Sequence, residues 1–170
     1  LRCVKCAQEM KRAMEGAGAG AFKRTRAPRA GQFTFKVLCP EPLVASVVGS
    51  NGSTVARIQD ESGAHLTFSR RGEYFPQSRL RILVISGTEP GELLAALEQV
   101  VEQVAACGEE ERQVLEGAGT LEDDDGDFVD ASGEYRLRCA LTESAASAAV
   151  GPGGHGLASL SEETGARLVV

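Results

Sequence analysis

The sequence predicts an α+β fold of order β-α-α-β-β-α, with three helices packed on a three-stranded antiparallel sheet, followed by a truncated second repeat. Two observations support this prediction. Two stretches recur 102 residues apart, and each contains a Gly-x-x-Gly turn followed by a helical pattern. Strand-like and helix-like periodicities alternate along residues 32–107, which predicts a single layered domain there.

The repeat aligns residues 33–68 with residues 135–170 without a gap, and nine of the 36 positions are identical. Chance would give roughly two or three identities at ordinary composition. The segment Gly49-Ser50-Asn51-Gly52 corresponds to Gly151-Pro152-Gly153-Gly154. A repeat of this kind is one supersecondary unit used twice, so each copy is informative about the other.

The first copy is typical of a strand, two helices around a glycine turn, and a second strand. Residues 33–39 alternate apolar and polar side chains, which predicts a strand. Residues 43–48 predict a short helix that leads into the turn. Val55 and Ile58 have the spacing of one helix face, and Gly63 is suited to end that helix as its C-cap.

The remaining elements of the first domain are also predicted from periodicity. Residues 64–68 and 79–86 predict two further strands. Residues 91–106 predict a helix with a wide apolar face. Thr88 is the predicted N-cap of this helix, and Pro90 falls in its first turn.

The second copy, residues 134–170, is incomplete. Its helix is predicted to end at Thr164-Gly165, and residues 166–170 are predicted to form a strand. It lacks counterparts of the last strand and the long helix. Because a half-domain buries little surface, we expect it to be partly ordered at best unless it docks on the first domain.

Composition and length are compatible with one or two small globular domains. The 170 residues are 42% hydrophobic, and no apolar run approaches the ~20 residues of a membrane span. The chain begins with Leu1 and shows no signal peptide, so we expect a fragment of a longer intracellular protein, nuclear or cytoplasmic. The five cysteines favour a reduced setting, with Cys39, Cys107 and Cys139 as buried or incidental thiols.

Charge is distributed in blocks. Residues 1–31 carry eight Lys/Arg and two Asp/Glu and predict a basic tail or linker. Residues 108–134 carry one basic and eleven acidic residues, and residues 108–133 predict a disordered acidic linker. Residues 1–14 have helical spacing and are open to two interpretations, a frayed tail or the last helix of a preceding domain.

The pattern around the first glycine turn resembles the KH domain, in its type I arrangement and as found in multi-KH, poly(C)-binding-like proteins. The resemblance rests on Val47-Val48-Gly49-Ser50-Asn51-Gly52-Ser53-Thr54-Val55, followed by Ile58 and Glu61-Ser62-Gly63-Ala64-His65-Leu66. It implies a module that binds single-stranded nucleic acid, in which the Gly-x-x-Gly loop clamps the backbone of about four nucleotides.

The resemblance also implies a set of binding residues. In the first copy these are Val48, Gly49, Ser50, Asn51, Gly52, Ser53, Val55, Arg57, Ile58, His65, Arg70 and Arg71. In the second copy they are Gly151, Pro152, Gly153, Gly154, His155 and Arg167. Neither loop carries the Lys or Arg that such loops usually have, and Pro152 lacks an N–H donor, so the second copy is the weaker predicted binder.

These observations predict an RNA-binding protein that recognises short single-stranded motifs, with a role in post-transcriptional regulation of mRNA. Two alternatives remain open. One is a degenerate KH module that mediates protein–protein contact or dimerisation through residues 79–86 or 91–106, and the other is binding of single-stranded DNA. The sequence holds no catalytic constellation, so we expect no enzyme. We also expect no cofactor, because Cys3-x-x-Cys6 has no second pair to complete a zinc site.

Overall fold

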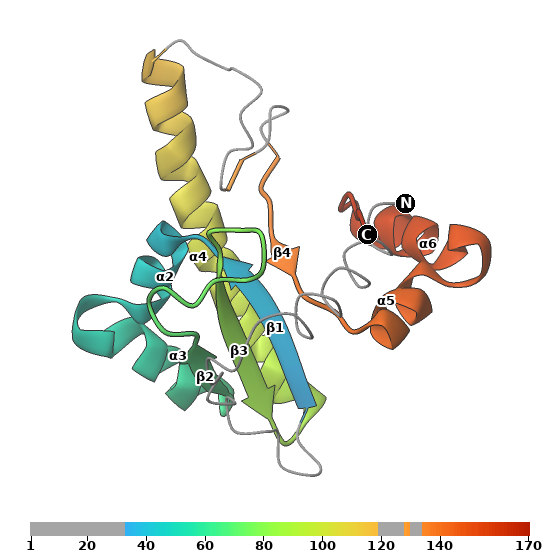
Figure 1. Cartoon of the computed structure of the whole chain (residues 1–170), viewed down its shortest axis with the longest axis horizontal. Helices are drawn as coiled ribbons and strands as arrows, with labels where there is room; N and C mark the ends of the chain where they lie inside the picture. Colours follow the sequence, from blue (N-terminus) through green and yellow to red (C-terminus); the bar gives the residue numbers. More distant parts are fainter. Residues whose placement is uncertain (1–32, 119–127, 130–133) are drawn as a thin grey trace. The chain divides into compact units, whose positions relative to one another are not determined.

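The computed structural model describes residues 33–118, 128–129 and 134–170 (Figure 1). The chain divides into two compact units, Arg26–Ala140 and one whose described residues are Leu141–Val170. The first unit contains β1 (Phe33–Cys39), α2 (Glu41–Val48), α3 (Ser53–Ser62), β2 (His65–Phe68), β3 (Arg81–Gly87) and α4 (Pro90–Ala118). The predicted β-α-α-β-β-α order is confirmed.

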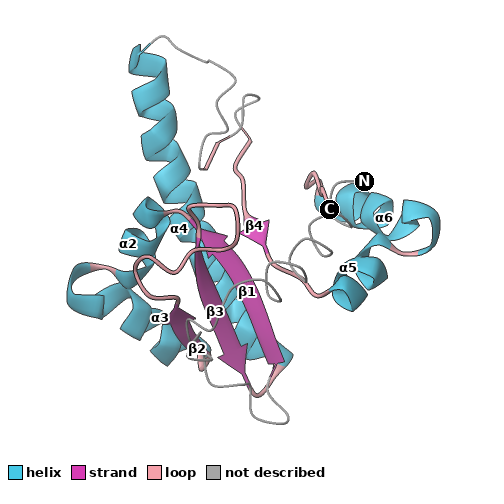
Figure 2. Ribbon diagram, in the orientation of Figure 1, coloured by secondary structure: helices cyan, strands magenta, loops and turns pink. Residues whose placement is uncertain are grey.

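The strands form one antiparallel sheet in the order β2-β3-β1 (Figure 2). β1 pairs with β3 along its whole length, from Phe33 opposite Gly87 to Cys39 opposite Arg81. A short fourth strand, β4 (Arg138–Cys139), pairs antiparallel with the other edge of β1. The predicted three-stranded sheet is therefore present, and it is extended by a strand that sequence reasoning did not assign to it.

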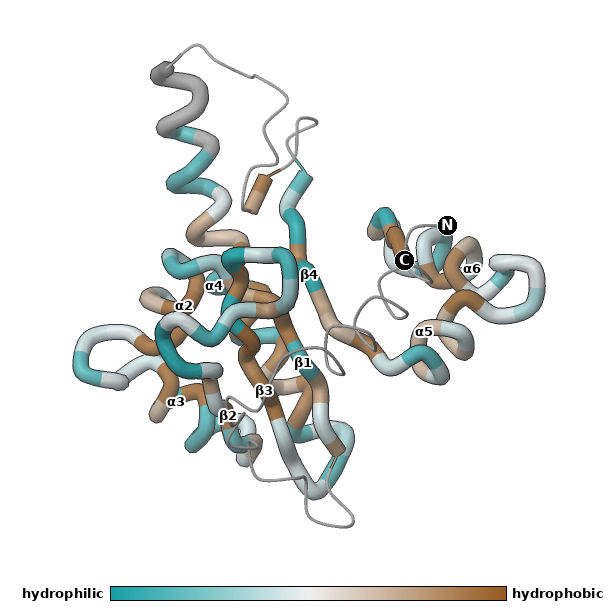
Figure 3. The backbone as a smooth tube through the Cα atoms, in the orientation of Figure 1, coloured by the Kyte–Doolittle hydropathy of each residue, from teal (hydrophilic) through white to brown (hydrophobic). Residues whose placement is uncertain are grey.

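The core lies between the sheet and the three helices. Because side chains alternate along a strand, Val37, Cys39, Leu83 and Ile85 share one face of the sheet, and all four are fully buried. The helices pack against this face through Leu43, Val44, Val47, Ile58, Ala96, Val100 and Val104. Figure 3 shows the hydrophobic residues gathered where strands and helices meet. Each fully buried Leu or Ile contributes about 1.5–3 kcal/mol, so this layer holds the domain together.

α4 is longer than the sequence indicates. It runs to Ala118, so the first part of the predicted linker 108–133 is helical rather than disordered. At its start the Glu92 carboxylate accepts hydrogen bonds from the N–H groups of Thr88, at 2.6 Å, and Glu89, at 3.3 Å. These bonds, the one from Thr88 above all, lower the pKa of Glu92. The hydroxyl of Thr88 also donates to Glu92, so the predicted N-cap acts through that carboxylate.

The second unit contains α5 (Glu143–Val150), a 3-10 turn η2 (Pro152–Gly154) and α6 (His155–Thr164). These helices occupy the positions equivalent to α2 and α3 in the aligned sequence, and neither has a buried residue. The predicted strand at 166–170 is wrong, because those residues are neither helix nor strand. A strand needs a neighbour for its N–H and C=O groups, and none is described within Leu141–Val170.

The cysteines differ in their surroundings. Cys39 and Cys107 are buried as predicted, whereas Cys139 is exposed. Burial raises the pKa of the Cys39 thiol to about 12 and also raises the pKa of Cys107. In the described ranges no three His, Cys, Asp or Glu side chains gather into a metal site, and no helix there is long and apolar enough to cross a membrane.

Several predicted segments lie outside the described residues. These are the helix at 1–14, the basic tail 1–31 with Cys3 and Cys6, and the acidic run at 122–127.

Candidate nucleic-acid interface

The first loop, Gly49–Gly52, connects α2 to α3 and is built on three residues with positive φ. Gly49 has φ 70° and ψ −178°, a combination that is essentially open only to glycine. Asn51 has φ 54° and ψ 26°, the left-handed conformation that Asn tolerates better than most residues. Ser50–Gly52 form a single 3-10 turn, η1, and α3 begins at once after it. The loop therefore projects at one end of the domain (Figure 1).

Two backbone N–H groups of the first loop are available to a ligand. The N–H of Gly52 donates to the Gly49 carbonyl at 3.3 Å, and the N–H of Ser53 donates to the Ser50 carbonyl. The N–H groups of Ser50 and Asn51 have no acceptor among the described residues, and both residues are exposed. Of the four N–H groups of residues 50–53, two are therefore free among the described residues, at the entry to a helix N-terminus that favours anions.

Thr54, which sequence reasoning missed, explains why Gly49 must be glycine. A Cβ at Gly49 would overlap the Oγ1 of Thr54 and lie 2.9 Å from its backbone N. The Thr54 side chain thus packs across the backbone of the first loop. The signal in the sequence is the spacing of the two residues, because the tight turn returns the chain to Gly49 five positions later.

The apolar residues near the first loop separate into surface and core. Val48 and Val55, which flank the loop, are half-buried and pack against the core from its edge. Ile58 and Val47 are fully buried, and Val44 is only 5% exposed. Of these residues, Val48 and Val55 can therefore offer apolar surface to a base, while Ile58 supports the site from below.

The outer edge of β2 adds backbone groups to this region. The Leu66 N–H points away from β3 and donates to Oε1 of Gln59 at 3.0 Å, while the Ser69 N–H donates to Ile82 of β3. This alternation leaves the Leu66 carbonyl and the Phe68 N–H on the outer edge, with no partner among the described residues. A carbonyl next to an N–H can pair with the Watson–Crick edge of a base.

His65 lies on the face of β2 that is turned away from the helices. Leu66 is buried on the helix side, so His65 and Thr67 point to the opposite face of the sheet. There the Nε2 of His65 lies 3.1 Å from the Thr67 hydroxyl oxygen. His65, which the resemblance implies as a binding residue, therefore lies on the opposite face of the sheet from the buried Leu66 side chain.

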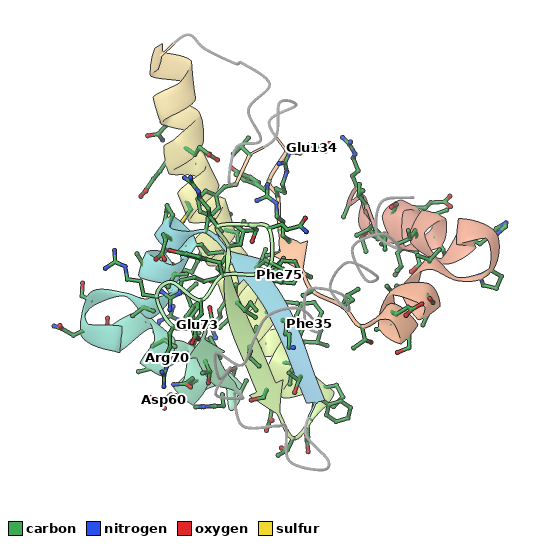
Figure 4. The ribbon with its side chains drawn as sticks, in the orientation of Figure 1. Phe35, Asp60, Arg70, Glu73, Phe75 and Glu134 are labelled. Carbon is green, nitrogen blue, oxygen red and sulfur yellow. The ribbon has the colours of Figure 1, made fainter. Side chains whose placement is uncertain are left out.

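The predicted arginines also separate. Arg57 donates to Glu61 of its own helix at 2.9 Å and to Oε1 of Gln99, on α4, at 3.1 Å, so its guanidinium is directed toward α4 and its charge is paired within α3. Arg70 and Arg71 are exposed in the loop after β2, and Figure 4 labels Arg70 and Glu73 of this loop. That loop is closed by the Arg70 N–H, which donates to the Glu73 carboxylate at 3.1 Å.

Arg81 holds this loop against the domain. Its Nε donates to the Ser69 carbonyl at 3.1 Å, and its guanidinium lies 5.6 Å above the Phe68 ring and 3.7 Å from the Glu41 carboxylate. A strand position alone does not predict this role. The side chain thus ties β3, the loop after β2 and the start of α2 together.

Comparison with known proteins identifies the family of this domain. Residues 34–102 match the model of the KH domain family. Residues 34–102 form a KH domain. The chain is similar to RNA-binding protein Nova-2 of Homo sapiens, with 30% identity over 66 residues, which is 39% of this chain and 13% of that protein. It is similar to RNA-binding protein Pasilla of Drosophila melanogaster, with 29% identity over 83 residues, which is 46% of this chain and 10% of that protein.

The chain therefore spans a small part of the length of these relatives. Among solved structures, the first KH type I domain of human Vigilin aligns with a TM-score of 0.38 and 19% identity, covering 55% of this chain and 93% of that domain.

The second loop, Gly151–Gly154, has fewer free donors than the loop of the KH domain. The Gly154 N–H donates to the Gly151 carbonyl at 3.3 Å, and Pro152 has no N–H. Only the Gly153 N–H is left without an acceptor among the described residues. His155 is exposed, and its Nδ1 lies 2.8 Å from the Pro152 carbonyl oxygen. Arg167 is exposed in the segment after α6.

Proposed function

We propose that the KH domain binds short single-stranded RNA through the first loop and the adjoining edge of β2. The observation that carries this proposal is the pair of unpartnered N–H groups at Ser50 and Asn51, exposed at the entry to α3. They are suited to one or two phosphates of the RNA backbone. That Nova-2 and Pasilla are RNA-binding proteins supports the same ligand class.

Bases would then lie between the loop and β2. Val48 and Val55 offer an apolar contact, and the Leu66 carbonyl and Phe68 N–H offer an acceptor and a donor. Such recognition addresses the Watson–Crick edge, which is accessible only in an unpaired strand. A role in post-transcriptional regulation of mRNA would follow from binding of this kind.

The charge around the site predicts a shallow salt dependence. The first loop has no cationic side chain, and Arg57 is paired with Glu61, so among the described residues we assign the phosphate contacts to the exposed Arg70 and Arg71. Two such contacts to a single strand give a slope of about −1.4 in log K against log salt. A steeper slope would mean that cations outside this surface take part.

The test is fluorescence anisotropy with the whole chain and labelled eight-nucleotide RNAs that are C-rich, U-rich, A-rich or G-rich, at low and high salt. DNA versions of the same sequences separate RNA binding from single-stranded DNA binding. The variant Ser50→Asp/Asn51→Asp places two negative charges beside the free donors. It is expected to abolish binding, because carboxylates would face the phosphates.

The matched control is Leu94→Glu/Val101→Glu, which adds the same charge on α4. Leu94 and Val101 are 66% and 44% exposed and lie one heptad apart. This variant should retain RNA binding. Failure of the folded wild-type chain to bind any pool, or equal binding by the loop variant, would contradict the proposal.

The control variant also tests the second candidate function. Leu94 and Val101 form an exposed apolar stripe of the kind that mediates contact between copies of a chain. Analytical ultracentrifugation would then show concentration-dependent association that is lost in Leu94→Glu/Val101→Glu. The loop variant should leave that association unchanged.

A further inference from the structure

The strand added to the KH domain comes from the second repeat. Residues 135–141 are the copy of β1, so Arg138 and Cys139 of β4 correspond to Lys36 and Val37. β4 nevertheless pairs with β1 itself, on the edge that β3 does not use. Two copies of the same strand therefore lie side by side in one sheet (Figure 2).

The register of this pairing has a local twofold symmetry. Val37 lies opposite Cys139, and these residues are 102 positions apart, so each faces its own repeat counterpart. Leu38 lies opposite Arg138, and on the other side of the centre the Ala140 N–H donates to the Lys36 carbonyl at 3.0 Å. Exchanging the two strands reproduces both pairs. This is an isologous contact, the type formed by two equivalent partners.

A second contact, independent of the strand register, fixes the segment before β4 to α4. The Glu111 carboxylate of α4 accepts hydrogen bonds from the N–H groups of Phe128 and Val129, both at 3.0 Å. Both side chains are buried, with 4% and 5% of their surface exposed. The Arg136 N–H donates to the Phe128 carbonyl at 2.7 Å, which joins this anchor to the strand.

Tyr135 completes the contact on the surface of α4. Its hydroxyl donates to the Glu109 carboxylate at 2.9 Å. Its ring lies over Gly108, where a Cβ would come within 2.6 Å of the ring and 3.2 Å of Val129. A glycine inside a helix costs about 1 kcal/mol relative to alanine, and here its missing side chain makes room for the ring.

We propose that the first strand of the second repeat is the resident partner of the β1 edge, so that the two repeats associate by pairing their equivalent strands. This assembly does not depend on RNA binding. The partner is the chain's own residues 135–140, because only residues 119–127 separate α4 from the Phe128 anchor. Such a tether gives an effective concentration in the millimolar range, which favours the internal strand over a second copy. The pairing also covers an edge that would otherwise invite other strands.

A disulfide tests the register. Val37 and Cys139 form a non-hydrogen-bonded pair, because the bonds fall at Lys36 and Ala140, and their Cα atoms are then about 4.5 Å apart. That spacing lies within the range for a disulfide. Val37→Cys in the full chain, with Cys39→Ala to simplify the mapping, should give an internal link between positions 37 and 139 on mild oxidation. Its yield should not change with protein concentration.

The matched control adds Cys139→Ser and should give no internal link. If the edge is instead the contact between two copies, the twofold symmetry places position 37 opposite position 37, and the control should form a covalent dimer. A covalent dimer, or a folded protein without the 37–139 link, would overturn the proposal.

Hydrogen exchange keeps the proposal testable if the cysteine variant does not fold. The Ala140 N–H faces β1, whereas the Cys139 N–H faces away from it. Ala140→Pro should therefore detach β4 and speed exchange of the Leu38 amide roughly tenfold or more. Cys139→Pro, which keeps the bond to Lys36, should leave that amide protected. Equal exchange of Leu38 in the unchanged chain and in Ala140→Pro would show that β4 is not docked in solution.

Discussion

The first and second loops have nearly the same backbone in very different surroundings. Both turn from one helix to the next through a 3-10 turn that follows one glycine and ends at another. The φ angles are 70° and 67° at Gly49 and Gly151, 54° and 62° at Asn51 and Gly153, and 80° and 82° at Gly52 and Gly154. The loop conformation is therefore encoded locally, by where glycine or asparagine permits positive φ.

The helices on either side of the two loops differ in burial. α2 and α3, on either side of the first loop, bury Leu43, Val44, Val47, Ile58 and Ser62. Their counterparts α5 and α6 bury none. The same local pattern thus produces the same shape with and without a sheet beneath it, but only the first copy gains stability from packing.

The largest expected contrast follows from this difference in burial. Ile58→Ala should lower the free energy of unfolding by about 2–5 kcal/mol, because Ile58 is fully buried and its removal leaves a cavity. Leu160→Ala changes the equivalent residue, which is 41% exposed, and should alter it by about 0.5 kcal/mol at most. Urea denaturation of the full chain followed by far-UV circular dichroism measures both. Equal losses would mean that the second repeat has a core in solution.

A smaller contrast is expected at the first glycine of each loop. Gly49→Ala forces a side chain into a conformation essentially reserved for glycine and against Thr54, at a cost of about 2–4 kcal/mol. In Gly151→Ala the nearest atom is the Gly156 N at 3.1 Å, so the backbone strain remains but the side-chain overlap is absent.

The double variant Gly49→Ala/Thr54→Gly tests that explanation by copying the second loop. It should recover the part of the loss that comes from overlap, measured by the same urea denaturation. No recovery would show that backbone strain at Gly49 accounts for the whole effect.

Patterns within single elements predicted most of the secondary structure. The side-chain positions that they did not predict depend on contacts between elements that are distant in sequence. Helix periodicity and glycine placement correctly gave α3 and the C-cap at Gly63, whose φ is 75°. They could not show that Arg57 turns toward Gln99 or that His65 points to the far face of the sheet. Those positions depend on which elements pack together, and no spacing within one element contains that information.

The pairing of strands was the second feature that the sequence did not predict. The sequence predicted a strand at 166–170, which is absent, and did not predict that residues 138–139 would join β1. In both cases the residues have ordinary strand composition. Whether they form a strand depends on a free edge elsewhere in the chain, since a strand is stabilised by its neighbour.

The smallest contrast concerns the ligand and isolates a single N–H group. Ser50→Pro gives the first loop the residue of the second, and the matching φ angles of the two loops indicate that it fits. It removes one of the two free donors at Ser50 and Asn51. Loss of a hydrogen bond to a charged phosphate is worth about 1.5–3 kcal/mol, so the Kd for RNA should rise by roughly tenfold or more. The free energy of unfolding should change little.

The reciprocal change, Pro152→Ser, restores a donor to the second loop, and any RNA binding by that repeat should then increase. Anisotropy titrations at fixed salt measure both changes, and urea denaturation confirms that each variant is folded. An unchanged Kd in a folded Ser50→Pro variant would mean that phosphate is held elsewhere, and the difference in donors between the two loops would then have no bearing on binding. A raised Kd without loss of stability would attribute the expected difference in RNA affinity between the repeats to one backbone N–H group, because the rest of the loop backbone is shared.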